Sequence, residues 1–299
     1  MAPTDPAKGT VTAVIFIPFT DGELSMLLDT LESIDRFVTE PHRVIAVDDC
    51  SRGHLDEELR RIRPDVTVLR NERKHGGRSG LYVTMANACK YALDHFDFGV
   101  FMKMDTDALM VGPGLVPQAI QYFDAHPDVG ILGSYRVRAD GQPRRWLKWK
   151  VAFWYEGHPF RGVLGRTRLW RDPIRRARRM GYDVGENVLG GAYFIREECL
   201  NAMRRDGLLD YKFDAILRES RIGDEIIFSL MCKASGYDIH DFGAPEHSMA
   251  LALTSLPLPK DEILRLKKTV IHSVKRGLDG ESQEELRAYF RARVPDPAG

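Results

Sequence analysis

The chain has 299 residues with 43 basic and 43 acidic side chains, so no net charge favours nucleic acid or an anionic membrane as its partner. Hydrophobic residues make up 43% of the chain, enough for one large α/β domain with additions or for two domains. The four cysteines lack the spacing of a zinc site or a disulfide framework, and neither a signal peptide nor an apolar run of ~18 residues is visible, which predicts a cytoplasmic protein with peripheral contact at the inner membrane face left open.

Apolar runs and helical spacings alternate through the first hundred residues. The run at 11–18 is rich in β-branched residues, as is typical of a strand buried on both faces. Further strands are expected at 43–47, 66–69 and 100–104, and helices at 24–34, 55–62 and around 85–93. This order predicts an α/β fold with a mostly parallel sheet flanked by helices, which binds ligands beyond the carboxyl ends of its strands.

Polar residues follow each of these strands, and we expect them to meet in one crevice. They are Thr20, Asp48, Asp49, the glycine-rich loop at 71–80, and the pair Asp105 and Asp107. Two carboxylates this close at the end of a buried run are costly unless they hold a cation, and hard ions such as Mg²⁺ take oxygen ligands. The alternative is a plain polar turn after a strand.

The glycine-rich loop is basic, because Arg73, Lys74, His75 and Arg78 surround Gly76 and Gly77. Such a loop can neutralise a diphosphate while its glycines let the backbone approach the ligand. The alternative is an exposed basic turn before a helix. No Gly-Lys-Ser/Thr sequence follows, so it is not a Walker loop.

The order of these motifs resembles the GT-A glycosyltransferases, in particular family 2. The motifs are Ile17-Pro18, Val47-Asp48-Asp49-Cys50-Ser51, Gly76-Gly77-Arg78 with Asn87 downstream, and the DXD motif Asp105-Thr106-Asp107. The similarity covers residues 11 to 135 and extends more loosely to about 250. It implies a Rossmann-like GT-A fold, a nucleotide-sugar donor and a divalent cation, Mn²⁺ or Mg²⁺.

The resemblance also implies roles for individual residues. Asp49 would accept a hydrogen bond from the base, Asp105 would lie near the ribose and the metal, and Asp107 would be the direct metal ligand. The nucleotide-sugar site expected in this way comprises Pro18, Phe19, Thr20, Asp49, Gly77, Arg78, Asp105, Gly190 and Gly191. A UDP-sugar is the favoured donor, and a GDP- or dTDP-sugar is the alternative.

A basic, tryptophan-rich insertion interrupts the second half of the chain, after a helix that begins at Pro113 and a strand at 129–135. Residues 144–179 hold twelve Arg or Lys side chains, two acids and all four tryptophans. These residues suit a lipid head group, a polyprenyl phosphate or a carbohydrate that stacks on rings. The alternatives are an insertion that merely packs on the domain and a peripheral membrane surface; nucleic acid is not expected.

The catalytic candidates lie further on. A strand at 188–195 contains Gly190 and Gly191, which permit close approach of a ligand, and a helix at 196–205 follows. Asp224 and Glu225 then open another helix, where carboxylates also act as simple first-turn charges. The pair resembles the Glu-Asp pair of the family with the residue types exchanged, and either carboxylate is a candidate general base, with Glu225 in the base position.

The C-terminal part completes the prediction. After a short strand at 237–242, His247 is a candidate third metal ligand, as in some GT-A enzymes, or else a surface histidine. Two amphipathic helices are expected within 260–293, where they would cover the site, dimerise or finish the core. Their apolar residues are Leu264, Leu266, Val270 and Ile271 in the first and Leu286, Tyr289 and Phe290 in the second. We expect a glycosyltransferase domain at 1–255, with a nucleotide-sugar half at 11–135 and an acceptor half at 136–255 that contains an insertion at 140–182, and a helical extension at 256–299.

The sequence thus predicts a metal-dependent glycosyltransferase that moves a sugar from a nucleoside-diphosphate sugar to an acceptor hydroxyl with inversion. The acceptor would be a carbohydrate, a lipid-linked molecule or a small molecule. Three alternatives stay open: a retaining GT-A enzyme, a sugar-phosphate nucleotidyltransferase, and a non-catalytic carbohydrate- or membrane-binding protein. The sequence does not decide the oligomeric state.

Overall fold

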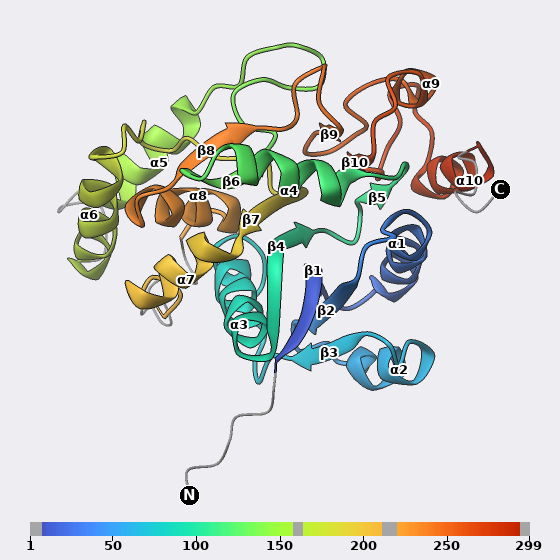
Figure 1. The fold of residues 1–299 in the computed structure, drawn as a ribbon, viewed down its shortest axis with the longest axis horizontal. Coiled ribbons are helices and arrows are strands. Elements are labelled where there is room, and N and C mark those ends of the chain that lie inside the picture. Colours follow the sequence, from blue (N-terminus) through green and yellow to red (C-terminus); the bar gives the residue numbers. More distant parts are fainter. Residues whose placement is uncertain (1–7, 158–163, 211–219, 294–299) are drawn as a thin grey trace, which may run out of the picture.

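A computed structural model describes residues 8–157, 164–210 and 220–293 (Figure 1). Its main feature is a seven-stranded sheet in the order β3-β2-β1-β4-β7-β6-β8. The strands are β1 (Gly9–Phe19), β2 (His42–Asp48), β3 (Thr67–Arg70), β4 (Phe96–Met104), β6 (Val129–Gly133), β7 (Ala192–Arg196) and β8 (Asp238–Asp241). Strands β1 to β4 pair in parallel, β8 is parallel to β6, and β7 runs antiparallel to both β4 and β6. The predicted mostly parallel α/β sheet is therefore confirmed.

Helices cover both faces of this sheet. Successive residues of a strand point to opposite sides, and because both sets of side chains are apolar, each face needs a cover. In β1, Ala13, Ile15 and Ile17 pack into the core beneath α1 (Leu24–Phe37) and α4 (Leu115–Ala125). The alternate residues Val14 and Phe16 pack into the core on the opposite face, beneath three of the helices given next, α3, α7 and α8. The remaining helices of the described residues are α2 (Leu55–Ile62), α3 (Ser79–His95), α5 (Leu147–Gly157), α6 (Leu164–Arg178), α7 (Glu197–Arg205), α8 (Asp224–Ala234), α9 (Lys260–Arg265) and α10 (Gln283–Arg293).

A second, three-stranded sheet joins distant parts of the chain. It has the order β5-β10-β9 and consists of β5 (Leu109–Met110), β9 (Met249–Leu251) and β10 (Val270–His272). The sequence analysis expected Val270 and Ile271 in a helix, but they are strand residues that pair with β5 and β9. The pairing brings the chain after residue 270 against the end of β4.

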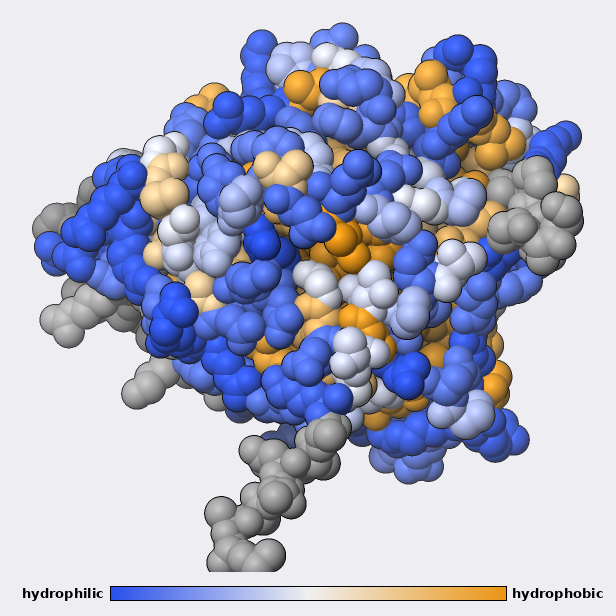
Figure 2. All heavy atoms as spheres, in the orientation of Figure 1, coloured by the Kyte–Doolittle hydropathy of each residue, from blue (hydrophilic) through white to orange (hydrophobic). Residues whose placement is uncertain are grey.

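Helices α5 and α6 lie at one end of the molecule in Figure 1, and α9 and α10 lie at the other end. The face in Figure 2 is mostly hydrophilic with smaller hydrophobic areas between, as the balanced charges of the sequence suggest. The segment at 188–191, expected as the start of a strand, lies outside β7, which begins only at Ala192.

Candidate active site

Two aspartates and a histidine form a compact group at the carboxyl end of β4. Asp105 and Asp107 follow the buried residues of that strand, and His272 ends β10. The His272 Nε2 atom lies 3.2 Å from Asp107 Oδ2 and 3.7 Å from Asp105 Oδ2. One ligand atom from each residue lies within 4.8 Å of the others, so the group is able to share one metal ion. The side chain of Asp105 is 26% exposed and gives the group access to solvent.

Gly191 leaves the space that the His272 ring occupies. A Cβ atom at this position would lie within 3.0 Å of three atoms of the ring, closer than real Cβ atoms approach their neighbours. Its carbonyl also accepts a hydrogen bond from the Asp105 N–H at 3.0 Å. Any side chain at this position would displace the His272 ring. The contact of one backbone segment with both His272 and Asp105 therefore requires a glycine.

Asp107 is buried and surrounded by groups that favour its charged form. Ser273 Oγ donates to its Oδ2 at 2.6 Å, and Lys275 Nζ lies 3.1 Å from the same oxygen. Burial opposes ionisation, but His272, Ser273 and Lys275 outweigh it and hold the pKa of Asp107 well below its usual value. Three neighbouring positions of the C-terminal segment thus converge on one carboxylate.

The Asp224-Glu225 pair lies on the other side of the glycines, at the start of α8. Asp224 is buried, its Oδ2 has no hydrogen-bond partner among the described residues, and burial raises its pKa well above the usual value. Glu225 is partly exposed, and a Cβ atom at Gly190 would lie 3.5 Å from its carboxylate. Of the two carboxylates, Glu225 is the one that a bound molecule can reach.

A buried lysine links the two acidic groups. Lys103, on β4, donates to Asp105 Oδ1 at 2.6 Å and also to the carbonyl of Gly190. Burial alone would lower the pKa of Lys103, but the charge of Asp105 and the hydrogen bond to it raise that pKa. An ammonium group here fixes the relative positions of Asp105 and the glycine segment, a role that the sequence analysis did not anticipate.

Asp49 organises the glycine-rich loop. Its carboxylate accepts hydrogen bonds from Asn71 Nδ2 at 2.9 Å and from the N–H groups of His75 and Gly76 at 2.8 and 2.7 Å. The loop ends at Arg78, which has a φ of 57°, a backbone conformation that side chains other than glycine adopt at a cost. Gly77 and Arg78 are exposed at this edge of the sheet.

The residues that end β1 differ in their surroundings. Pro18 is half-buried, whereas the ring of Phe19 belongs to the core and is 1% exposed. The Thr20 N–H donates to Glu23 Oε2 at 2.9 Å, while its hydroxyl is buried without a partner among the described residues. Burial and the charges of Asp105 and Asp107 raise the pKa of Glu23, so this carboxyl borders the metal-ligand group although the sequence gave no signal for it.

His247 lies outside the Asp105-Asp107-His272 group. Its ring stacks on Phe242, with 5.6 Å between ring centroids, and its Nδ1 atom is buried without a partner among the described residues. His272 is the histidine that reaches the aspartates, and the sequence analysis overlooked it because it assigned the preceding residues to a helix.

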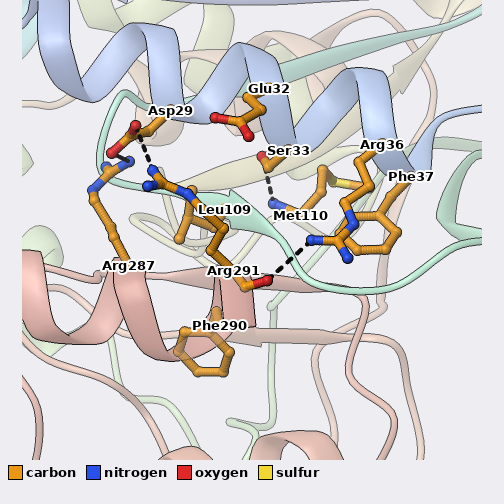
Figure 3. A pocket seen from close by; sticks show the side chains of 10 residues that line it. All are labelled: Asp29, Glu32, Ser33, Arg36, Phe37, Leu109, Met110, Arg287, Phe290 and Arg291. Atoms are coloured by element: carbon orange, nitrogen blue, oxygen red, sulfur yellow. Dashed lines mark hydrogen bonds and ion pairs between the residues drawn. The ribbon is translucent and has the colours of Figure 1, made fainter. Parts of the chain in front are cut away.

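The C-terminal helix α10 supports the turn between the two aspartates through Arg287, which Figure 3 shows beside Asp29 of α1. Arg287 Nη2 donates to the carbonyl of Thr106 at 2.7 Å, and Thr30 Oγ1 donates to the same carbonyl at 2.9 Å. The Arg287 side chain is 5% exposed and also faces Asp29 of α1. The backbone of the DXD motif is therefore fixed from both α1 and α10.

The tryptophan-rich insertion is partly packed and partly exposed. Trp170 is buried and donates from Nε1 to Glu156 at 3.1 Å, and Trp146 stacks on Tyr135 with 5.7 Å between centroids. In contrast, Trp154 is 57% exposed. Within the described residues, no helix has the length and apolar character needed to cross a membrane.

Three comparisons relate the chain to known proteins. A search of curated proteins found no match. Two crystal structures of S. aureus TarS 1-349, one of them in complex with UDP-GlcNAc, share 15% and 14% identity with the chain, with TM-scores of 0.41 and 0.43. The similarity covers 78% of this chain but only 58% and 56% of theirs, so the chain spans less than two thirds of their length. The model of glycosyl transferase family 2 matches residues 14–208, and the chain belongs to that family of GT-A glycosyltransferases.

Proposed function

We propose that the protein transfers a sugar from a nucleoside-diphosphate sugar to an acceptor hydroxyl, with inversion at the anomeric carbon and with a divalent cation as cofactor. One observation carries the proposal: a candidate metal site and a candidate general base lie beside two adjacent glycines. Glu225 lies beside Gly190, and the Asp105-Asp107-His272 group lies beside Gly191. A UDP-sugar is the favoured donor.

The donor set fits a divalent cation. Two carboxylates supply the oxygen ligands that Mn²⁺ and Mg²⁺ prefer, and the His272 imidazole adds a nitrogen ligand that suits Mn²⁺ better than Mg²⁺. Asp107, Asp105 and His272 would hold the ion, with His272 in the role that the sequence analysis gave to His247. Such an ion, when bound, supplies positive charge that stabilises the departing diphosphate.

Glu225 is the proposed general base. Its partly exposed carboxylate takes the proton from the acceptor hydroxyl as the oxygen forms a bond to the anomeric carbon. The bond between that carbon and the diphosphate oxygen breaks, and its electron pair leaves with the nucleoside diphosphate. Asp224 is buried, and its raised pKa means that it already holds a proton, so it is less suited to receive one from the acceptor.

Two basic side chains are proposed to bind the diphosphate of the donor. Lys275 is 58% exposed beside Asp107, and Arg78 stands at the end of the loop that Asp49 holds in place. Both are positioned to neutralise a diphosphate. The unpartnered hydroxyl of Thr20 and the half-buried Pro18 would contact the nucleoside.

The test is a thermal-shift panel of UDP, GDP, dTDP and CDP, each with Mn²⁺, with Mg²⁺ and with a chelator. A ligand that binds only the folded chain raises the melting temperature. We expect one diphosphate, most simply UDP, to raise it with metal and not with chelator. NMR assignment of the product anomer then tests inversion, and a retained configuration would refute the role of Glu225.

A further inference from the structure

A cationic pocket lies between α5 and the segment that leads into α8, and of its residues the proposed function uses only Arg78. It is lined by Arg78, Lys148, Trp149 and Arg221, and its volume is about 360 Å³. Its lining holds three cations and no acid. Among the described residues, neither the Arg78 nor the Arg221 guanidinium has an ion-pair partner, so the charge of the pocket is uncompensated.

This pocket continues into an apolar groove along α5. The groove shares Lys148, Trp149 and Arg221 with the pocket and extends over Leu147, Val151, Ala152 and Tyr155. Its one acid, Glu156, is 3% exposed, and its carboxylate accepts hydrogen bonds from Ser220, Arg221 and Trp170. The carboxylate is therefore not available to repel an anion in the groove.

The outer face of α5 is unusually apolar for a surface helix. Of the eight large hydrophobic side chains that are exposed in the described residues, four lie on this helix: Leu147 at 71%, Val151 at 55%, Trp154 at 57% and Tyr155 at 46%. Their spacing places them on one side of the helix. Single exposed apolar residues are ordinary, but a cluster rimmed by cations indicates a binding surface.

Buried contacts fix this surface relative to Glu225. The Glu156 carboxylate of α5 accepts from the Arg221 N–H at 2.8 Å, and Ser220 Oγ accepts from the Ile222 N–H at 3.1 Å. The segment that carries Arg221 then leads directly into α8, where Glu225 lies four residues further on. An anion held by Arg221 would thus stand close to the proposed base.

We propose that this pocket and groove bind the acceptor, and that the acceptor is a lipid in which a phosphate joins a hydroxyl-bearing head group to a hydrocarbon tail. The phosphate pairs with Lys148 and Arg221, because guanidinium and ammonium groups pair well with phosphate oxygens, and Arg78 is left for the donor diphosphate. The tail follows the exposed apolar side of α5, and the head group reaches Glu225. The inference rests on the proposed function for its catalytic part, and the binding surface stands on its own contacts.

The test is co-sedimentation of the full chain with vesicles. Phosphatidylglycerol is the probe, because a phosphate joins its hydroxyl-bearing head to its tails, and pure phosphatidylcholine is the reference. Each basic residue at an anionic surface contributes about a fivefold factor to binding. We expect preferential binding to vesicles with phosphatidylglycerol, and a loss of at least roughly 20-fold in Lys148→Gln/Arg221→Gln.

Matched variants separate a built site from general charge. Arg178→Gln/Arg179→Gln removes the same charge from the neighbouring basic segment, outside the pocket, and should lose less than fivefold. Leu147→Ser/Val151→Ser changes two exposed residues without touching the core and should weaken binding as strongly as the pocket variant. Circular dichroism and melting temperature verify that all variants fold.

Several results would overturn the inference: equal loss in the two charge variants, wild-type binding in Leu147→Ser/Val151→Ser, or binding of glycerol phosphate as strong as that of the vesicles. The Mn²⁺-UDP thermal shift is measured on the same samples. A normal shift without pocket-dependent vesicle binding refutes the acceptor site alone. Pocket-dependent vesicle binding without any diphosphate shift refutes the donor site instead, and with it the catalytic role of the lipid.

Discussion

Gly191→Ala is the sharpest test of the proposed metal centre, because it adds one methyl group and changes no ligand. The new Cβ atom would overlap the His272 ring, and even the most distant of the three nearest ring atoms, Cδ2, would lie at 2.6 Å. That atom must retreat by about 0.8 Å to reach an ordinary contact of 3.4 Å. Metal–ligand distances tolerate changes of only about 0.2 Å, so His272 can no longer bind an ion held by the two aspartates.

The expected loss is large enough to measure. Even residues that only orient a ligand change metal affinity by about 10- to 100-fold, so displacement of His272 should weaken Mn²⁺ binding by at least that factor. Titration of the protein with Mn²⁺, followed by the electron paramagnetic resonance signal of the free ion, measures the affinity without any substrate. Forcing a methyl group into a packed site also costs about 1–3 kcal/mol of unfolding free energy, which urea denaturation measures.

Two further variants make the test specific. Gly190→Ala places its Cβ atom at 3.5 Å from the Glu225 carboxylate, an ordinary contact, and should bind Mn²⁺ like the wild type. In Gly191→Ala/His272→Ala the ring is gone, so the stability should recover while the Mn²⁺ affinity stays as low as in His272→Ala. If Gly191→Ala binds Mn²⁺ as tightly as Gly190→Ala, His272 is not a ligand.

Three further predictions concern the residues around this centre. Asp107→Asn should abolish both Mn²⁺ binding and sugar transfer while urea denaturation still shows a cooperative fold; transfer at the wild-type rate would exclude metal dependence through this residue. Asp224→Asn tests the raised pKa: folded wild-type protein keeps a proton that the unfolded chain releases above about pH 4, so its unfolding free energy falls as the pH rises from there. The loss between pH 4.5 and 7.5 should be smaller in the variant, and an equal loss would contradict the burial argument. Arg287→Met removes a buried partner of Asp29 and of the Thr106 carbonyl, and should cost about 3 kcal/mol of unfolding free energy and weaken Mn²⁺ binding, whereas Arg287→Lys should retain part of both.

The first half of the fold was predictable because its strands are buried on both faces. Such strands appear in the sequence as continuous apolar runs, and the runs at 11–18 and 100–104 lie within the observed β1 and β4. The polar residues after these runs mark the carboxyl edge of the sheet. Asp105 and Asp107 therefore appeared as a cation site from sequence alone, and the described structure brings them to one point with His272.

The histidine was not predictable by the same reasoning. β10 has only three residues, and it exists because Val270 and Ile271 pair with strands that begin more than 150 residues earlier at β5 and about 20 residues earlier at β9. A three-residue segment carries no periodicity of its own, so Leu264 and Leu266 before it suggested a continuing helix. The contacts of Lys103 were not predictable either, because the sequence around a single lysine in an apolar run does not indicate which carboxylates it will contact.

The C-terminal segment connects these observations. Residues 256–299 were expected as an extension that covers the site, joins a dimer or finishes the core. They supply three side chains to Asp107, from residues 272, 273 and 275, and Arg287 fixes the carbonyl of Thr106 between the two aspartates. The family match ends at residue 208, so the DXD motif lies within the matched region, while the side chains that surround the Asp107 carboxylate lie outside it. The charge state of Asp107 and the position of the DXD turn therefore depend on how the last thirty residues of the described chain pack. The affinity of the proposed metal centre should accordingly respond to changes in α10 that never touch the donor.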